Sequence, residues 1–129
     1  MVLDTSALIA LLLGEPEAPT FRAAIEADVV RLVSAANLLE TAMVIQTRLG
    51  EQGGRELDLL IRVAECEVVP VDSAQVAVAR QAFRRFGKGR HSAGLNFGDC
   101  FAYALALTTA EPLLVKGSDF AATDVLRVV

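Results

Sequence analysis

The sequence predicts a single α/β domain in which a parallel sheet lies between helices. Short apolar segments alternate with longer segments of helical periodicity along all 129 residues, and this alternation is typical of a parallel, mostly buried sheet with helices on both faces. Hydrophobic residues make up 53% of the chain and aromatic residues 5%. This composition favours helices packed on strands and argues against disorder. The length suits one domain, residues 1–129, with a single core.

In the first half of the chain, apolar periodicity and the residues that begin or end helices define the expected elements. Asp4, Thr5 and Ser6 are helix-capping types that follow an apolar run, so a strand is expected to pass directly into a helix. Gly50 ends a later helix, and the polar, glycine-containing segment 51–54 predicts a flexible turn. The expected order is strand 1–3, helix 7–13, helix 17–28, strand 29–33, helix 35–49 and helix 55–65.

The second half continues the alternation. Pro70 places its strand at an edge or at a strand end, and Asp72 is expected to cap the helix that follows. Asn96 is a further cap, and the eleven residues after Asp99 carry no charge, which predicts a buried helix. The expected order is strand 67–71, helix 73–86, a basic loop 87–92, a helix between Asn96 and Glu111, strand 113–115, a short helical turn and strand 126–129.

Charge and cysteine usage exclude several classes of protein. The net charge of −4 argues against a basic nucleic-acid binder. Cys66 and Cys100 match no metal or redox spacing and are expected to be small buried hydrophobes. A single histidine, His91, argues against a zinc site. No apolar run is long enough to cross a membrane, and the N-terminus has no signal-peptide pattern, so a cytoplasmic protein is expected.

Four acidic residues occupy unusual places for carboxylates. Asp4 follows the first strand, Asp119 follows strand 113–115, and Asp99 lies on the first turn of an otherwise uncharged helix. Glu40 lies on the apolar half of its helix, with no basic residue three or four positions away to pair with it. A simpler interpretation is open for Asp4 and Asp99, because aspartates in these positions commonly cap helices.

These four positions can converge at one edge of the sheet, where the ends of parallel strands and the starts of helices meet. Two carboxylates about 4 Å apart repel by about 4 kcal/mol at an effective dielectric constant near 20. Either their pKa values rise or a cation neutralises them. A cluster of oxygen ligands suits a hard ion, Mg²⁺ or Mn²⁺, which shares its coordination with phosphate and activates water.

The same residues, in order along the whole chain, resemble a PIN domain, and more narrowly the VapC-type toxins of prokaryotic toxin–antitoxin pairs. The resemblance implies a three-layer α/β/α fold with a central parallel sheet of about five strands. The four acids in register carry it, and the stretch around Asp99 is its most specific part. The matching segments are Asp4-Thr5-Ser6-Ala7-Leu8, Glu40 on its apolar helix, Leu95-Asn96-Phe97-Gly98-Asp99-Cys100, and Lys116-Gly117-Ser118-Asp119-Phe120 with Thr123-Asp124.

The resemblance implies a metal-dependent endoribonuclease. In such an enzyme Asp4, Glu40, Asp99 and Asp119 would hold Mg²⁺ or Mn²⁺, and a metal-bound water would attack the RNA phosphodiester. Ser6 would help by hydrogen bonding a ligand, water or phosphate. Asp124 corresponds to a further acid of many members and would orient the metal ligands without binding the ion itself. A turn or helix cap is an equally good interpretation. Ser118 departs from the Asp or Asn that relatives often have there.

The stretch between Asp72 and Asp99 contains no acid but five of the twelve Lys and Arg residues. Within it, one set of residues is a candidate for contacts with RNA phosphates, which would position the substrate without reading its sequence. A solvated helix face is the simpler interpretation, and we favour it for Arg80. The candidates are Arg84, Arg85, Lys88, Arg90 and His91.

The resemblance also implies partners: a small antitoxin that blocks the active site, and a second copy of the chain in a homodimer. Helix 73–86 and the turn at 51–54 could present surface for either contact. Two alternatives remain open. One is another Mg²⁺-dependent α/β phosphoryl-transfer enzyme, although Ser6 stands where a phosphatase of the haloacid-dehalogenase type needs a second Asp. The other is a catalytically inactive PIN-like binding module, which would show little stabilisation by Mg²⁺ or Mn²⁺.

Overall fold

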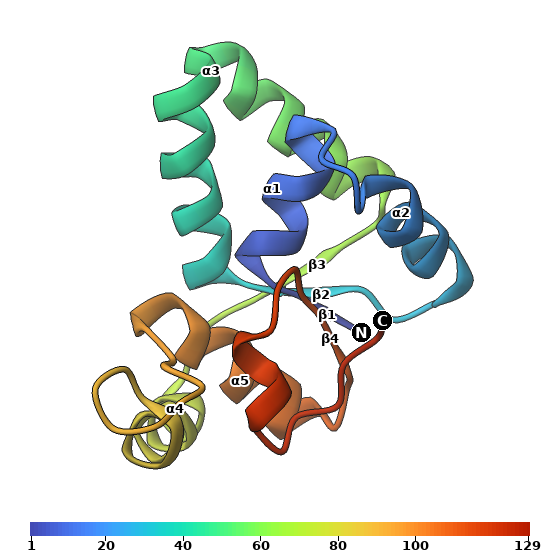
Figure 1. Ribbon diagram of the computed structural model, residues 1–129. Coiled ribbons are helices and arrows are strands. Elements are labelled where there is room, and N and C mark those ends of the chain that lie inside the picture. The colour runs from blue at the N-terminus through green and yellow to red at the C-terminus, as the bar shows by residue number, and fades with distance from the viewer.

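A four-stranded parallel sheet forms the centre of the computed structural model, which describes residues 1–129 (Figure 1). The strand order is β3-β2-β1-β4, and Val2 lies opposite both Leu32 and Leu113 in the neighbouring strands. The predicted α/β class is therefore confirmed. The strands are β1 (Val2–Leu3), β2 (Leu32–Ser34), β3 (Glu67–Val69) and β4 (Leu113–Leu114).

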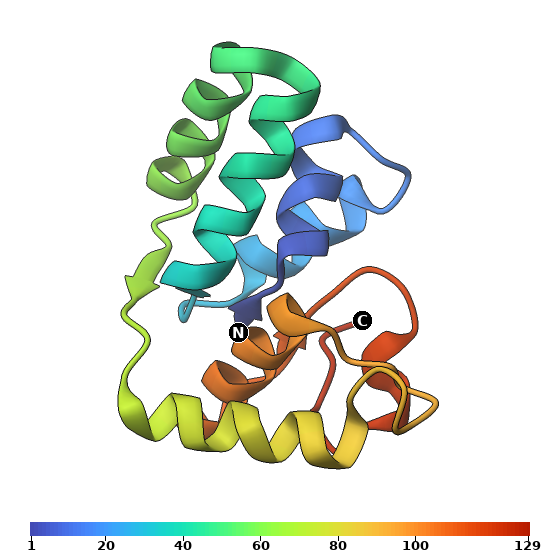
Figure 2. The same cartoon turned by 90° about the vertical axis from the view of Figure 1, so that its left-hand side faces the viewer.

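Helices cover both faces of the sheet, as Figures 1 and 2 show. On one face lie α1 (Thr5–Leu13), α2 (Ala18–Ala27) and α3 (Ala35–Val63); on the other lie α4 (Ser73–Phe86) and α5 (Phe97–Thr109). A short 3₁₀ helix, η1 (Asp119–Ala122), follows β4. None of these helices combines the length and the apolar character that a membrane crossing requires.

The alternation of side chains along the strands divides the core into two clusters. Val2, Leu32 and Leu113 belong to the cluster under α4 and α5, whereas their neighbours Leu3, Val33 and Leu114 belong to the cluster under α1 and α2. Because successive side chains of a strand point to opposite faces, even strands of two or three residues contribute to both layers. Strands β1, β2 and β4 are therefore buried on both sides, as their apolar sequence predicts, whereas the edge strand β3 is largely exposed.

The helix pair expected over 35–49 and 55–65 is one element, α3, with a sharp bend. Only Gly50 departs from helical geometry, with φ of 66° and ψ of −154°, so the flexible turn expected at 51–54 is wrong. The helix restarts at once, and Gly53 lets its second half approach the first: a Cβ at position 53 would lie 2.3 Å from the Ile45 side chain. The two halves of α3 form the tight hairpin visible in Figure 2.

The last expected strand, 126–129, is reduced to a single parallel bridge between Leu113 and Arg127. Two backbone hydrogen bonds hold it, from the Leu113 N–H to the Leu126 carbonyl at 2.7 Å and from the Val128 N–H to the Leu113 carbonyl at 3.0 Å. The sheet thus has four strands and a one-residue extension beside β4. At the other edge lies β3, as Pro70 predicts.

Candidate functional site

Asp4 follows β1 directly and caps the N-terminus of α1. Its Oδ2 accepts hydrogen bonds from the Ser6 backbone N–H at 2.9 Å and from the Ser6 hydroxyl at 2.7 Å, so the capping interpretation is confirmed. The residue is only 4% exposed. Burial raises its pKa to about 6, the bonds from Ser6 oppose the rise, and the negative charges of Asp99 and Glu40 add to it. Capping alone does not account for a carboxylate held so far from water.

Glu40 lies near the start of α3, and its carboxylate fits against α1 and α5. Oε1 accepts hydrogen bonds from the Thr5 hydroxyl and, at 3.3 Å, from the Asn37 side-chain amide. A Cβ at Gly98 would lie 2.3 Å from Oε2 of Glu40. The glycine that precedes Asp99 is thus the residue that makes room for Glu40.

Asp99 is the third residue of α5 and forms a capping box with Asn96. Its Oδ2 accepts from the Asn96 N–H at 3.0 Å, and its own N–H donates to Asn96 Oδ1 at 3.0 Å. Burial raises the pKa of Asp99, the Asn96 bond opposes this, and the charges of Asp119 and Glu40 raise it further. The expected cap is confirmed, and the same carboxylate faces two other acids.

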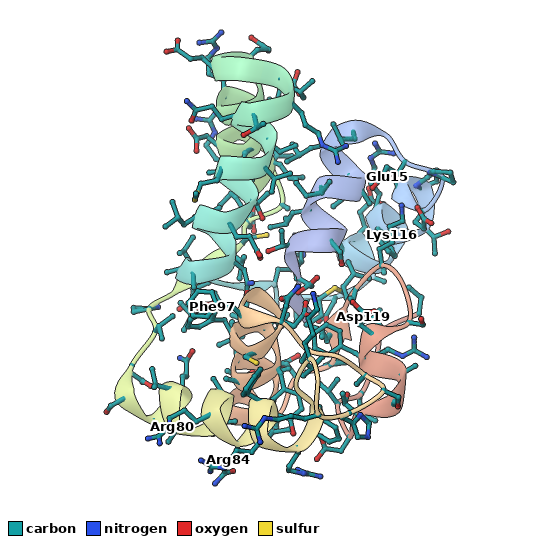
Figure 3. All side chains as sticks on the ribbon, turned by 60° about the vertical axis from the view of Figure 1, so that its left-hand side comes forward. Glu15, Arg80, Arg84, Phe97, Lys116 and Asp119 are labelled. Atoms are coloured by element: carbon teal, nitrogen blue, oxygen red, sulfur yellow. The ribbon has the colours of Figure 1, made fainter.

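Asp119 is exposed and begins η1 in the segment after β4. Its segment is joined to Asp4 through Ser6, whose hydroxyl oxygen accepts a 2.9 Å hydrogen bond from the Lys116 backbone N–H. Ser6 therefore donates to one acid and accepts from the segment that bears another. Figure 3 shows Asp119 below Lys116, which belongs to the same segment after β4.

The four carboxylates interact through their charges and lack basic partners. The charges of Asp99 and Glu40 raise the pKa of Asp4, and the charges of Asp119 and Glu40 raise the pKa of Asp99. Every salt bridge in the molecule involves other acids. No three His, Cys, Asp or Glu side chains are positioned to hold a metal ion as they stand. The donor set, all oxygen and uncompensated, nevertheless suits a hard divalent cation.

Sequence reasoning missed Thr5, Asn37 and Gly98, which hold Glu40 in place. Asn37 is fully buried, and its amide nitrogen lies 3.0 Å from the Gly98 carbonyl oxygen and 3.3 Å from Thr5 Oγ1. Its Oδ1 has no hydrogen-bond partner. The sequence carried one signal: a polar residue one turn before the unpaired Glu40. The fully buried residues in this half of α3 are Asn37, Thr41 and Ile45, so two of the three are polar.

The hydrogen bonds of Asp124 involve none of the four acids. Its Oδ1 accepts a 2.6 Å hydrogen bond from the Tyr103 hydroxyl, and its Oδ2 accepts from Arg85 at 3.3 Å. The Tyr103 bond and Arg85 lower the pKa of Asp124, and burial together with Asp124 raises the pKa of Tyr103 to about 12. Asp124 therefore ties the C-terminal segment to α4 and α5.

The basic candidates occupy the end of α4 and the loop after it, and all are exposed. Arg85 pairs with Asp124 and lies over the Phe86 ring at 4.6 Å, and Arg90 lies over the Phe83 ring at 5.4 Å. The His91 ring meets Phe86 edge-on at 5.2 Å. Arg84, Lys88 and Arg90 form no salt bridge, and of these three only Arg90 lies over an aromatic ring.

An apolar groove of about 590 Å³ lies between α4 and α5. Val76 and Phe83 line it from α4, and Phe97 and Phe101 line it from α5. Phe97 is 82% exposed and directly precedes Gly98, and Figure 3 shows it at the start of α5 with Arg80 and Arg84 along α4. The groove thus begins next to the acidic residues and has two arginines in its lining.

The chain is similar to known proteins along nearly its whole length. The family model for the PIN domain matches residues 1–126. Ribonuclease VapC30 of Mycobacterium tuberculosis is 56% identical over 128 residues, which cover 99% of this chain and 98% of that protein. Ribonuclease VapC of Mycolicibacterium smegmatis is also 56% identical over 128 residues, with 99% of both chains covered.

Two solved structures share the fold at low sequence identity. Mycobacterium tuberculosis VapC20, described as a toxin that cleaves the sarcin–ricin loop, superposes with a TM-score of 0.78 and 20% identity over 97% of this chain and 95% of that one. VapBC2 from Rickettsia felis, bound to a DNA fragment from its promoter, gives a TM-score of 0.73 and 14% identity over 98% and 94% of the two chains. At these identities the likeness concerns the fold alone.

Proposed function

From the premise that this chain belongs to the PIN-domain family, among its VapC ribonucleases, we propose that it is the toxin of a toxin–antitoxin pair. It cleaves RNA internally, at a site formed by four carboxylates. One observation carries the proposal: the charges of Asp99 and Glu40 act on Asp4, those of Asp119 and Glu40 act on Asp99, and no Lys or Arg forms a salt bridge with any of the four. The four are Asp4, Glu40, Asp99 and Asp119.

The residues of the site fit a divalent cation, Mg²⁺ or Mn²⁺. Asp4 keeps Oδ1 free of hydrogen bonds, and Glu40 keeps Oε2 free. A bound ion would polarise the scissile phosphodiester and lower the pKa of a water molecule beside it. Ser6 orients Asp4, and Thr5 with Asn37 orients Glu40, so two of the ligands are held before any ion arrives.

Arg84 and Lys88 are the candidates that we favour for contacts with RNA phosphates, since neither pairs with an acid of this chain or lies over an aromatic ring. Arg90 and His91 lie on the adjoining loop, where Arg90 extends the same positive surface. Arg85 shares its charge with Asp124 and is expected to contribute less. Asp124 does not contact the reacting groups; its hydrogen bond to Tyr103 holds the C-terminal segment against α5.

The proposed antitoxin occupies the apolar groove between α4 and α5. The support is the groove's lining, in which exposed aromatic rings are accompanied by Arg80 and Arg84, a combination that suits an amphipathic segment with acidic residues. A VapBC complex is among the structural relatives.

Homodimerisation through other exposed apolar residues, such as Leu39 and Met43 of α3, belongs to the same proposal. The protein would work in the cytoplasm, where its free thiols stay reduced.

A cleavage assay tests the proposal. Purified protein, freed of any antitoxin, is incubated with total RNA in parallel samples containing Mg²⁺, Mn²⁺ or EDTA. Discrete fragments that appear only with a divalent ion, and that disappear with Asp99→Asn, are the expected result. Cleavage that persists in EDTA would overturn the metal site. Absence both of cleavage and of thermal stabilisation by the ions would instead favour an inactive binding module.

A further inference from the structure

Lys116 is joined to the rest of the molecule at both its backbone and its side chain. Its N–H donates to Ser6 Oγ at 2.9 Å, and the Ser6 hydroxyl donates to Asp4. Its ammonium donates to Glu15 at 2.9 Å and lies 3.6 Å from Glu17. Figure 3 shows the Lys116 and Glu15 side chains beside each other above Asp119. One residue thus connects the segment after β4 to the start of α1 and to the α1–α2 turn.

The residues between Lys116 and Asp119 do little to fix their own conformation. Gly117 has φ of 93°, a conformation that favours glycine, and Ser118 makes no side-chain bond to cap η1. Both are exposed. Beyond Asp119, the ring of Phe120 is buried at 1% exposure. The place of the Asp119 carboxylate therefore depends on two anchors, Phe120 after it and Lys116 before it.

The ion pairs of Lys116 with Glu15 and Glu17 are partly shielded from water, and the ammonium compensates the charge of both carboxylates. The side chains of Lys116, Glu15 and Glu17 are 35%, 28% and 39% exposed. Glu17 Oε2 is buried without a hydrogen bond, so the ammonium is its compensating charge. Glu15 raises the pKa of Lys116, chiefly through their hydrogen bond. Without the ammonium the two glutamates would repel each other and lose their link to the segment.

We propose that Lys116 is a positioning residue of the ribonuclease site: its ion pair with Glu15 and Glu17 holds the segment bearing Asp119 beside Asp4. This inference rests on the proposed function, in which Asp119 helps to bind the divalent ion. Lys116 itself touches neither the ion nor the RNA. Its effect is on where a ligand lies, as expected of groups that orient metal ligands from outside.

Lys116→Met removes the ammonium but keeps the length of the side chain and the backbone bond to Ser6. The Kd for Mn²⁺ is expected to rise roughly tenfold, within the range for loss of such outer groups. The kcat falls at low Mn²⁺ and recovers at high Mn²⁺, while KM for RNA stays unchanged. Lys116→Arg keeps the charge and should retain most of the affinity. A matched control is Arg22→Met, because Arg22 is exposed on α2 and forms no salt bridge.

The primary measurement is Mn²⁺ binding in the absence of RNA, and the electron paramagnetic resonance signal of the free ion monitors it. Thermal melting in EDTA checks that each variant is folded. If Lys116→Met does not fold, Glu15→Gln provides the same test, with a smaller loss in the same direction. The double variant Glu15→Lys with Lys116→Glu should recover part of the affinity that each single change loses.

Unchanged Mn²⁺ affinity in Lys116→Met would overturn the inference while leaving the ribonuclease site intact. A rise in KM for RNA with normal Mn²⁺ binding would also overturn it, because the ammonium would then contact the substrate. If the wild-type protein binds no Mn²⁺, the proposed function itself fails and the inference falls with it. The two failures are therefore distinguishable.

Discussion

The carboxylate of Glu40 lies so close to Gly98 that a methyl group at position 98 would be 2.3 Å from Oε2 and 2.6 Å from Oε1. Gly98→Ala must therefore displace the end of Glu40, which is a flexible side chain, while the backbone can stay in place. We expect cleavage to fall about 100-fold, because misplacing a catalytic group by about an ångström costs that much. The free energy of unfolding should change by only about 1 kcal/mol.

Gly54→Ala is the matched control, since nothing lies within 4 Å of a Cβ at that position. It should cleave RNA like the wild type and melt at the same or a slightly higher temperature. Initial cleavage rates and thermal melts of the two variants decide the matter. A fully active Gly98→Ala would show that the position of Glu40 is unimportant for catalysis.

The buried carboxyl group of Asp4 predicts an unusual pH dependence of stability without metal. Its pKa is raised from 3.8 to about 6, so the folded protein holds this proton more tightly than the unfolded chain does. The stabilisation is complete below about pH 4 and is lost as the pH rises through 6. A shift of about two units corresponds to at most roughly 3 kcal/mol.

Urea unfolding of the wild type and of Asp4→Asn, in EDTA at pH 5 and pH 8, isolates this contribution from other titrating groups. The wild type should lose stability relative to Asp4→Asn at the higher pH. Added Mn²⁺ should reverse the trend, because the ion binds the deprotonated carboxylate. Parallel pH profiles for the two proteins would show that Asp4 is ionised at both pH values.

Asp99→Asn should abolish cleavage without unfolding the protein. Asparagine at this position can still accept the hydrogen bond from the Asn96 N–H, and removing the charge relieves the interaction with Asp119 and Glu40. In EDTA at neutral pH its melting temperature should equal or slightly exceed that of the wild type. Asp58→Asn, a change at an exposed site on α3, is the control. An unfolded Asp99→Asn protein would mean that the capping role dominates.

The Tyr103–Asp124 hydrogen bond is expected to stabilise the fold rather than to take part in the chemistry. Tyr103→Phe removes the 2.6 Å bond and keeps the buried ring, so the free energy of unfolding should fall by about 1–2 kcal/mol. Cleavage at a temperature where both proteins are folded should stay within a few-fold of the wild type. A much larger loss of kcat would place Asp124 closer to the reaction.

Local chemistry explains which elements could be predicted from the sequence. The caps at Asp4, Asp72 and Asn96 lie beside the backbone groups they bond, so composition and spacing suffice to locate them. Gly50 was recognisable as a break, but the close approach of the two halves of α3 depends on Gly53, which lies against Ile45. The terminal strand pairs through one residue only, a limit that its apolar sequence does not reveal.

The residues of the candidate site also divide into those that the sequence reveals and those that only the structure reveals. Asp4, Glu40, Asp99 and Asp119 were conspicuous because each breaks a local pattern of apolarity or pairing. Asn37 was not, because its shortest hydrogen bond joins it to the Gly98 carbonyl, 61 residues away in the chain. Lys116 likewise pairs with Glu15, 101 residues distant. Groups that orient a site act across the fold, so only the three-dimensional structure identifies them.

The central claim is that four carboxylates share a divalent ion, and anomalous scattering from crystals grown with Mn²⁺ tests it most directly. The account predicts a manganese peak bounded by Asp4, Glu40, Asp99 and Asp119, and its loss in crystals of Asp99→Asn. A map without such a peak, or with manganese bound only at other acids such as Glu15 and Glu17, would contradict it.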